Sequence, residues 1–170
     1  MRLQKGAESP AGVTIYQAPE NMTYKEFLET KIELATENGT VINPAEVNPV
    51  LKPHQRDAVM WALKGGRRAL FESFGLGKTV QELEFCHLAV KHNGGRALIV
   101  LPLGVKQEFT RDAVEVLGYE KPVYCRTMEE VQQSSSEIVL TNYERVRDGD
   151  IQPEFFTATS LDEASVLRSF

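Results

Sequence analysis

The sequence predicts an α/β protein in which a central parallel sheet carries helices on both faces, a three-layer architecture. Segments with helical periodicity alternate with short apolar runs from Pro53 onward. The runs, of which Ala97–Leu101 is the clearest, are apolar at successive positions, as strands buried on both faces are. The 170 residues are 42% hydrophobic and 25% charged, which is typical of a folded globular protein and argues against a disordered or fibrous chain.

Residues 1–50 are predicted to form a leader with an accessory helix. The leader contains Gly, Pro and Ser without a clear period and has one short strand at Val13–Tyr16. Thr23 and Glu26 form a capping box, and the apolar residues after it recur at three- and four-residue spacing, which predicts an amphipathic helix. A connector with three prolines follows, so we place the main domain at residues 51–170.

The main domain is predicted to contain five strands and five helices in alternation. The expected helices are Pro53–Leu63, Lys78–His92, Val105–Leu117, Met128–Gln132 and Tyr143–Arg147. The expected strands are Arg68–Phe71, Ala97–Leu101, Val123–Cys125, Ile138–Thr141 and a fifth that ends at Leu161.

Charge, cysteine usage and hydropathy restrict the class of function. The net charge is −5, but residues 52–111 hold ten basic and five acidic groups, so an anionic ligand is expected in this middle segment. Cys86 and Cys125 are not at metal-ligand spacing and are expected to be buried thiols, which favours a reducing, cytoplasmic setting. No apolar run approaches the roughly 18 residues that a membrane span needs.

The most specific motif is FESFGLGKT at residues 71–79, placed between a predicted strand and a predicted helix. Glycines allow backbone N–H groups to curl around a phosphate, and the helix N-terminus directs its unpaired donors at the same anion. Lys78 adds a point charge, and the Thr79 hydroxyl is placed to ligate Mg²⁺. A glycine-rich helix cap is the alternative explanation. The residues expected to bind the nucleotide are Ser73, Phe74, Gly75, Leu76, Gly77, Lys78 and Thr79.

Glu72 stands where the common phosphate-loop pattern has its first glycine. A loop of this form resembles the Swi/Snf-like branch of the superfamily-2 (DEAD/DEAH-type) helicases and translocases, members of which occur in phage and mobile-element proteins. The resemblance implies a RecA-like P-loop NTPase domain that binds ATP with Mg²⁺. The segment LKPHQ is similar to the family's adenine-recognition segment, so Gln55, 23 residues before Lys78, is expected to contact adenine.

Two further segments resemble the family's nucleic-acid-facing motifs. In LIVLPLGVKQEF, residues 98–109, the resemblance assigns backbone contacts to Pro102, Leu103 and Lys106. In VLTNYERV, residues 139–146, it assigns them to Thr141, Asn142 and Tyr143. Hydroxyl and amide groups at strand ends suit phosphate and sugar contacts, which position a strand without reading its sequence. The implied partner is nucleic acid, and DNA is favoured over RNA.

The segment LDEAS, residues 161–165, resembles the family's Asp-Glu-Ala-His box, with Ser165 where histidine is usual. The resemblance implies that Asp162 holds Mg²⁺ together with Thr79. It also implies that Glu163 orients and deprotonates the water that attacks the γ-phosphate. The run Thr157–Ser160 before this box is less apolar than a buried strand usually is.

The resemblance accounts for one lobe, cut after the carboxylate strand. In the family the next strand inserts between the phosphate-loop and carboxylate strands, so we expect this slot to be empty or otherwise filled. A second RecA-like lobe with an arginine finger would belong to a longer polypeptide. The main interpretation is the first lobe of an ATP-driven double-stranded DNA translocase or helicase. The alternatives are a nucleotide-binding switch or scaffold without motor activity and, less favoured, a small-molecule kinase.

Overall fold

The computed structural model describes residues 4–8, 14–17, 23, 37–73 and 75–163. The chain divides into two compact units, with the boundary in the sequence between Glu37 and Asn38. The first unit holds an antiparallel hairpin of β1 (Gln4–Glu8) and β2 (Thr14–Gln17). Strand β2 lies within one residue of the predicted strand Val13–Tyr16, whereas nothing in the sequence pattern predicts β1. The predicted accessory helix lies outside the described residues, apart from its first capping residue.

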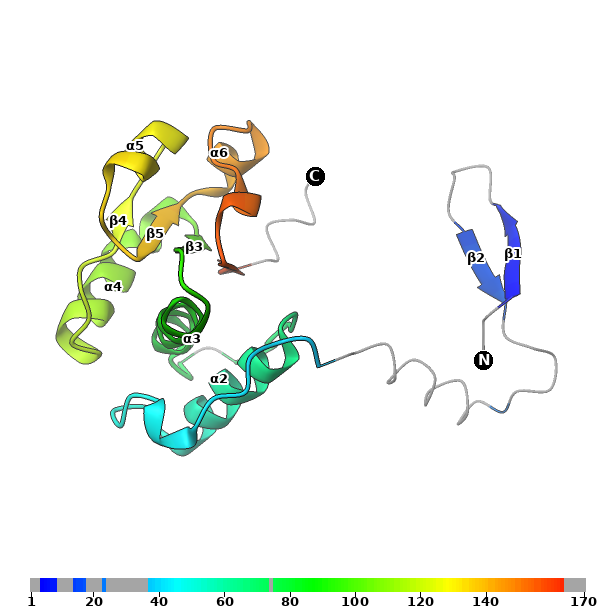
Figure 1. The fold of residues 1–170 in the computed structure, drawn as a ribbon, viewed down its shortest axis with the longest axis horizontal. Coiled ribbons are helices and arrows are strands. Elements are labelled where there is room, and N and C mark those ends of the chain that lie inside the picture. The colour runs from blue at the N-terminus through cyan, green and yellow to red at the C-terminus, as the bar shows by residue number, and fades with distance from the viewer. Residues whose placement is uncertain (1–3, 9–13, 18–22, 24–36, 74, 164–170) are drawn as a thin grey trace. The chain divides into compact units, whose positions relative to one another are not determined.

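The second unit is built on a four-stranded, all-parallel sheet with the strand order β4-β5-β3-β6 (Figure 1). Strand β3 is central and pairs with β5 on one side and β6 on the other. Because all strands are parallel, their carboxyl ends meet at one edge of the sheet. The strands are β3 (Ala97–Val100), β4 (Val123–Tyr124), β5 (Ile138–Thr141) and β6 (Ala158–Leu161).

Helices cover both faces of this sheet, as a three-layer α/β fold requires. Alternate residues of β3 enter two separate apolar clusters, with Ile99 on one face and Leu98 on the other. The Ile99 cluster includes side chains of α2 (Pro53–Gly65), α3 (Lys78–Asn93) and α4 (Lys106–Arg111). The Leu98 cluster includes side chains of α5 (Met128–Gln133) and α6 (Tyr143–Arg147). The predicted fold class is therefore confirmed.

The proline-containing connector packs into this unit instead of linking two bodies. Ile42, Val47 and Leu51 are buried in the Ile99 cluster, on either side of the short helix η1 (Pro44–Glu46). The backbone N–H of Asn48 donates a hydrogen bond of 2.8 Å to the buried carboxylate of Glu84 on α3. Burial of these apolar side chains explains why the compact unit begins at Asn38.

Two predicted elements differ from the structure. Residues Arg68–Phe71 do not form a strand, and the side chain of Phe71 is 97% exposed. Within the described residues β6 pairs with β3 alone, and Arg68–Phe71 takes no part in the sheet. The predicted helix Val105–Leu117 is divided into a 3₁₀ turn, η2 (Leu103–Val105), then α4, then a π-helical turn, η3 (Asp112–Val116). The other helices and strands of the main domain match to within two residues at each bound; a short 3₁₀ turn, η4 (Pro153–Phe155), precedes β6.

Candidate nucleotide site and nucleic-acid face

The sequence-predicted site residues gather at the carboxyl edge of the sheet and at the N-terminus of α3. In parallel α/β sheets this edge is where ligands bind, because loops and helix N-termini converge there. Asp162 and Glu163 follow β6 directly, and the backbone N–H of Asp162 extends the ladder by donating to the Val100 carbonyl at 2.9 Å. Lys78 is the first residue of α3.

The phosphate loop has the backbone geometry that an anion cradle needs. Gly75 and Gly77 have φ angles of 83° and 75°, in the left-handed region that glycine adopts without a steric penalty. Gly77 is also the N-cap of α3, so the unpaired N–H groups of this helix begin at the loop. A Cβ atom at Gly77 would lie 2.4 Å from the Gln55 side-chain nitrogen, so a larger residue would displace that side chain and would also strain the left-handed backbone. Phe74 lies outside the described residues.

Gln55 contacts the phosphate loop directly. Its side-chain Nε2 donates to the Leu76 carbonyl at 2.9 Å, and its Oε1 accepts from the Lys52 backbone N–H at 2.8 Å. The amide is 7% exposed and belongs to the first turn of α2. Gln55 therefore connects α2 to the loop, at the position where the family resemblance expects an adenine contact.

A second glutamine braces the same loop, and sequence reasoning missed it. Gln81 on α3 is 2% exposed, and its Nε2 donates to Glu72 Oε2 at 2.8 Å and to the Leu76 carbonyl at 3.3 Å. These bonds join the two ends of the loop. The Oε1 atom of Gln81 is buried and has no hydrogen-bond partner among the described residues. The spacing of Gln81 in the sequence could have identified it, because position 81 follows Lys78 by three residues and therefore lies on the same side of the helix.

One hollow of about 760 Å³ brings the chemical groups together. Its lining includes Glu72, Lys78, Asp162 and Glu163, which come from the loop, α3 and the end of β6. Thr79, the next residue of α3, is half-buried and is not part of this lining. The sequence-predicted lysine and carboxylate pair are thus neighbours in space, although Lys78 and Asp162 are 84 residues apart in the chain.

The residues present fit a bound nucleotide with Mg²⁺. The described residues contain no cluster of three or more His, Cys, Asp or Glu side chains that could cage a metal ion. Mg²⁺ does not require such a cage, because it is commonly held by one or two carboxylates together with substrate phosphates and water. A lysine and carboxylates that line one hollow, with a glycine loop directly before that lysine, are the donor set that this arrangement needs.

Burial and like charge act together on Asp162. Desolvation and the neighbouring Glu163 charge raise the pKa of Asp162, while Lys78 lowers it. Glu163 has a φ angle of 55°, a left-handed conformation that residues other than glycine rarely adopt. Backbone strain of this kind is characteristic of functional sites.

Glu82 is a fourth carboxylate of the hollow, and the sequence motifs do not mark it. Burial raises its pKa to about 8, with a smaller contribution from the Asp162 charge, while a hydrogen bond with Ser160 on β6 opposes the shift. Its Oε2 atom is enclosed and has no partner among the described residues. Glu82 is one turn after Lys78 on α3, so the spacing of four residues is the signal that could have found it.

The residues after β3 are accessible, as a nucleic-acid contact requires. Pro102 is the N-cap of η2 and Leu103 is 57% exposed. Lys106 begins α4, and its ammonium nitrogen lies 4.9 Å from the ring centroid of Tyr124, a cation–π contact. The structure thus places Lys106 beside the end of β4.

The residues after β5 are buried and make internal contacts. Thr141 is completely buried and its hydroxyl donates to the Cys125 carbonyl at 2.9 Å, so this side chain does not reach the surface. Asn142 is 6% exposed and its Oδ1 accepts from the Tyr124 hydroxyl at 3.0 Å. Tyr143 is 7% exposed and its hydroxyl donates to the Asp162 backbone carbonyl. The burial pattern was not visible in the motif, because strand-end residues face the surface in some folds and the core in others.

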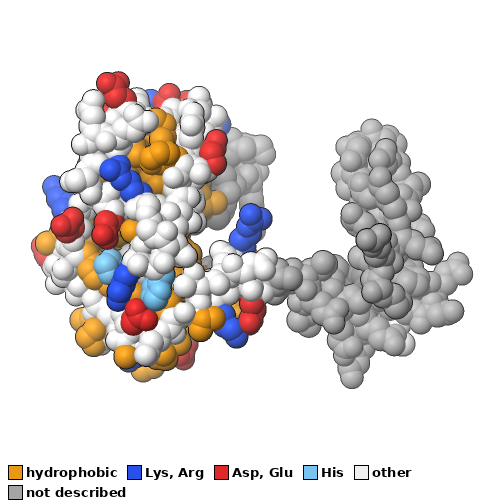
Figure 2. Space-filling model, viewed as in Figure 1, with side chains coloured by type: hydrophobic (Ala, Val, Ile, Leu, Met, Phe, Trp, Pro, Cys, Tyr) orange, Lys and Arg blue, Asp and Glu red, His pale blue; other side chains and the backbone are white. Residues whose placement is uncertain are grey.

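The face of the molecule shown in Figure 2 does not carry one dominant charge. The face in Figure 2 mixes acidic and basic side chains with separate hydrophobic patches, in keeping with the net charge of −5. None of the described helices has the length and apolar character to cross a membrane. Both cysteines are free thiols and buried, as the sequence predicts.

Comparison with known proteins identifies the fold. The crystal structure of the UvsW helicase from bacteriophage T4 superimposes with a TM-score of 0.58 at 19% sequence identity. The match covers 86% of this chain and 52% of the UvsW chain, so this chain spans about half the length of that helicase. No protein-family model matches the sequence, and no curated protein matches it significantly. The domain is therefore a RecA-like α/β domain with the fold of a helicase domain.

Proposed function

We propose that this chain contains the first lobe of a nucleic-acid-dependent ATPase, a helicase or translocase of the Swi/Snf-like branch that acts on double-stranded DNA. The observation that carries the proposal is the single hollow in which Lys78, Asp162 and Glu163 meet beside the glycine loop. The helicase-like fold supports it, because Asp162 and Glu163 follow β6 at the carboxyl edge of the sheet, where such domains bind ligands.

Each residue has a physical role in this proposal. The backbone N–H groups from Gly75 to Thr79 and the Lys78 ammonium bind the phosphates, and Gln55 contacts the adenine when it leaves the Leu76 carbonyl. Thr79 and Asp162 would hold Mg²⁺, which neutralises charge on the phosphate oxygens when bound. Glu163 orients the attacking water and accepts its proton.

The remaining parts of the proposal concern partners and setting. Pro102, Leu103 and Lys106 contact the nucleic-acid backbone, while Asn142 and Tyr143 act from beneath the surface by holding neighbouring groups. A second RecA-like lobe supplies the arginine finger, and the protein works in the cytoplasm. The runner-up is a nucleotide-binding switch or scaffold module without motor activity.

Nucleotide binding provides the direct test. Calorimetric titration of the 170-residue chain with ATP and Mg²⁺ is expected to show binding that Lys78→Ala largely removes, because this change deletes the mobile cation at the phosphates. The matched control is Lys91→Ala, which removes the same charge near the other end of α3, where Lys91 pairs with Glu46 at 3.2 Å. Equal affinity of the parent and Lys78→Ala would refute the assignment.

A further inference from the structure

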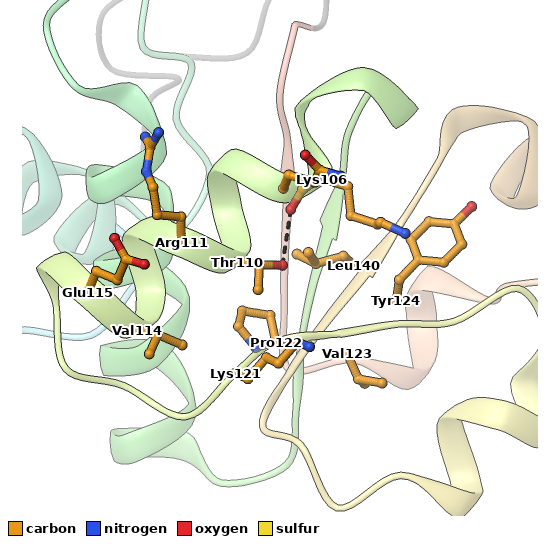
Figure 3. A pocket seen from close by; sticks show the side chains of 11 residues that line it. Lys106, Thr110, Arg111, Val114, Glu115, Lys121, Pro122, Val123, Tyr124 and Leu140 are labelled. Atoms are coloured by element: carbon orange, nitrogen blue, oxygen red, sulfur yellow. Dashed lines mark hydrogen bonds between the residues drawn. The ribbon is translucent and has the colours of Figure 1, made fainter.

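A second hollow, of about 630 Å³, lies beside the edge strand β4 and shares no lining residue with the nucleotide site. Helix α4 and η3 form one wall, and residues 121–124 form the other (Figure 3). Within the described residues β4 pairs with β5 alone, so this side of the sheet is an edge. The position of the hollow at a sheet edge leaves it open to a ligand from solvent.

Part of the lining of the hollow is apolar and includes an aromatic ring. Val114, Val123 and Leu140 line it together with the half-buried ring of Tyr124. The Tyr124 hydroxyl donates to Asn142 Oδ1 at 3.0 Å, which anchors the outer end of the ring. A ring that is held in place within an apolar depression favours a flat, unsaturated group as the ligand.

The rim of the hollow is mostly cationic. Lys106 and Lys121 line it, and within the described residues neither forms an ion pair. Arg111 also lines it, but its guanidinium pairs with Asp112 at 2.8 Å, so its charge is partly neutralised. Glu115 is the one acidic lining residue. In Figure 3 the Lys106 ammonium points at the Tyr124 ring from the N-terminus of α4.

We propose that this hollow binds one unpaired nucleotide of a nucleic-acid strand. The base stacks on the Tyr124 ring once the Lys106 ammonium moves from the ring to the adjoining phosphate, which Lys121 also contacts. Aromatic rings in a cationic groove are the general means by which proteins bind single strands, and stacking tolerates any base. Two residues that the sequence assigns to nucleic acid, Lys106 and Asn142, both contact Tyr124, so the hollow continues the proposed backbone interface. The inference rests on the nucleic-acid part of the proposed function and extends it to a strand with exposed bases.

The test compares two labelled oligonucleotides of equal length and charge, an oligo(dT) and its abasic counterpart, by fluorescence anisotropy with the 170-residue chain. The oligo(dT) is expected to bind about tenfold more tightly, as one stacked base can provide. Tyr124→Ala should abolish this difference. Tyr124→Phe keeps the ring and should retain it. Lys121→Ala should weaken both strands equally and reduce the log–log salt slope by about 0.7.

The outcomes separate this inference from the proposed function. Equal binding of the two oligonucleotides by the parent, or oligo(dT) binding that Tyr124→Ala leaves unchanged, would overturn the stacking site while nucleic-acid binding stands. The second of these outcomes is also the one expected if the β4 edge binds a strand of another protein instead of a nucleotide. Failure of the parent to bind either oligonucleotide would overturn both this inference and the nucleic-acid part of the proposed function. Phe155→Ala, which removes a half-exposed aromatic ring outside the hollow, is the control and should leave both affinities unchanged.

Discussion

The Tyr143 hydroxyl donates a hydrogen bond to the backbone carbonyl of Asp162. Tyr143 is the first residue of α6, directly after β5, and Asp162 is the first residue after β6. Burial and the nearby Asp162 charge raise the pKa of Tyr143 to about 12, so its hydroxyl stays protonated and remains a donor at neutral pH. The motif expected to face nucleic acid is therefore joined by one bond to the backbone of the carboxylate pair.

This bond predicts an effect of Tyr143→Phe on nucleotide binding. The change removes one buried hydrogen bond and should lower the free energy of unfolding by about 1 kcal/mol. Because the Asp162 backbone loses its support, affinity for ATP with Mg²⁺ should fall several-fold in calorimetry. Tyr119→Phe is the matched control, since the Tyr119 hydroxyl donates to Glu84, away from the nucleotide site. The link has no functional role if both variants bind nucleotide as the parent does.

Glu82 predicts a pH dependence of stability. Its pKa is about 8 in the folded protein against an ordinary value of 4.5, so between these pH values the folded chain holds a proton that the unfolded chain has lost. The stabilisation that the folded state gains from this bound proton is complete below pH 4.5 and is lost as the pH rises through about 8. Glu82→Gln removes this titration and should make the protein more stable than the parent at about pH 8, by roughly 2–3 kcal/mol for a half-buried side chain.

Urea denaturation across the range from about pH 5 to pH 8 measures this difference. The two proteins should have similar free energies of unfolding near the acid end and diverge toward the basic end. In Glu82→Gln the free energy of unfolding should still fall slightly as the pH rises, because the pKa of Asp162 is also raised. Parallel profiles for the two proteins would show that Glu82 does not titrate in this range.

The brace of Gln81 on the phosphate loop gives a prediction that uses a residue swap. Gln81→Ala removes the bonds to Glu72 and Leu76, so the loop loses its fixed curvature and ATP affinity should fall about tenfold. The double variant Glu72→Gln with Gln81→Glu exchanges donor and acceptor and restores one of the two bonds. In calorimetry its affinity for ATP should therefore lie between that of the parent and that of the weaker of its two single variants, Glu72→Gln and Gln81→Glu. An affinity no better than that of the weaker single variant would mean that the pair does not act through this bond.

Much of the fold could be predicted because each signal was local. The alternation around β3 and β5 is a property of a few consecutive residues, and the GLGKT run specifies a loop and a helix start by itself. Arg68–Phe71 has the same local pattern as a strand, but a strand also needs a neighbour to complete its hydrogen bonds. Whether such a neighbour is present depends on the order of the strands in the sheet, and periodicity carries no information about that order.

Local motifs also predicted part of the candidate site. Motifs identified Lys78, Asp162 and Glu163, which line one hollow in the structure. They could not show that Thr141 is buried with its hydroxyl bonded to Cys125, because burial depends on the helices that pack over β5. Glu82 was missed because its carboxylate differs from a solvated one only through tertiary enclosure next to β6.

The last prediction concerns turnover and depends on Glu163. If this domain is one lobe of a motor, Glu163 can orient the water, but the charge that develops on the γ-phosphate needs an arginine from a second lobe. Such an arginine is worth roughly 10³–10⁵ in rate. The 170 residues tested alone should therefore bind nucleotide and release phosphate no faster than their Glu163→Gln variant in a steady-state assay. Glu163→Gln is a suitable background because it retains the side-chain length and the left-handed backbone at φ 55°. Robust phosphate release by the parent above this background would mean that the domain is a complete enzyme by itself, and the half-motor interpretation would be wrong.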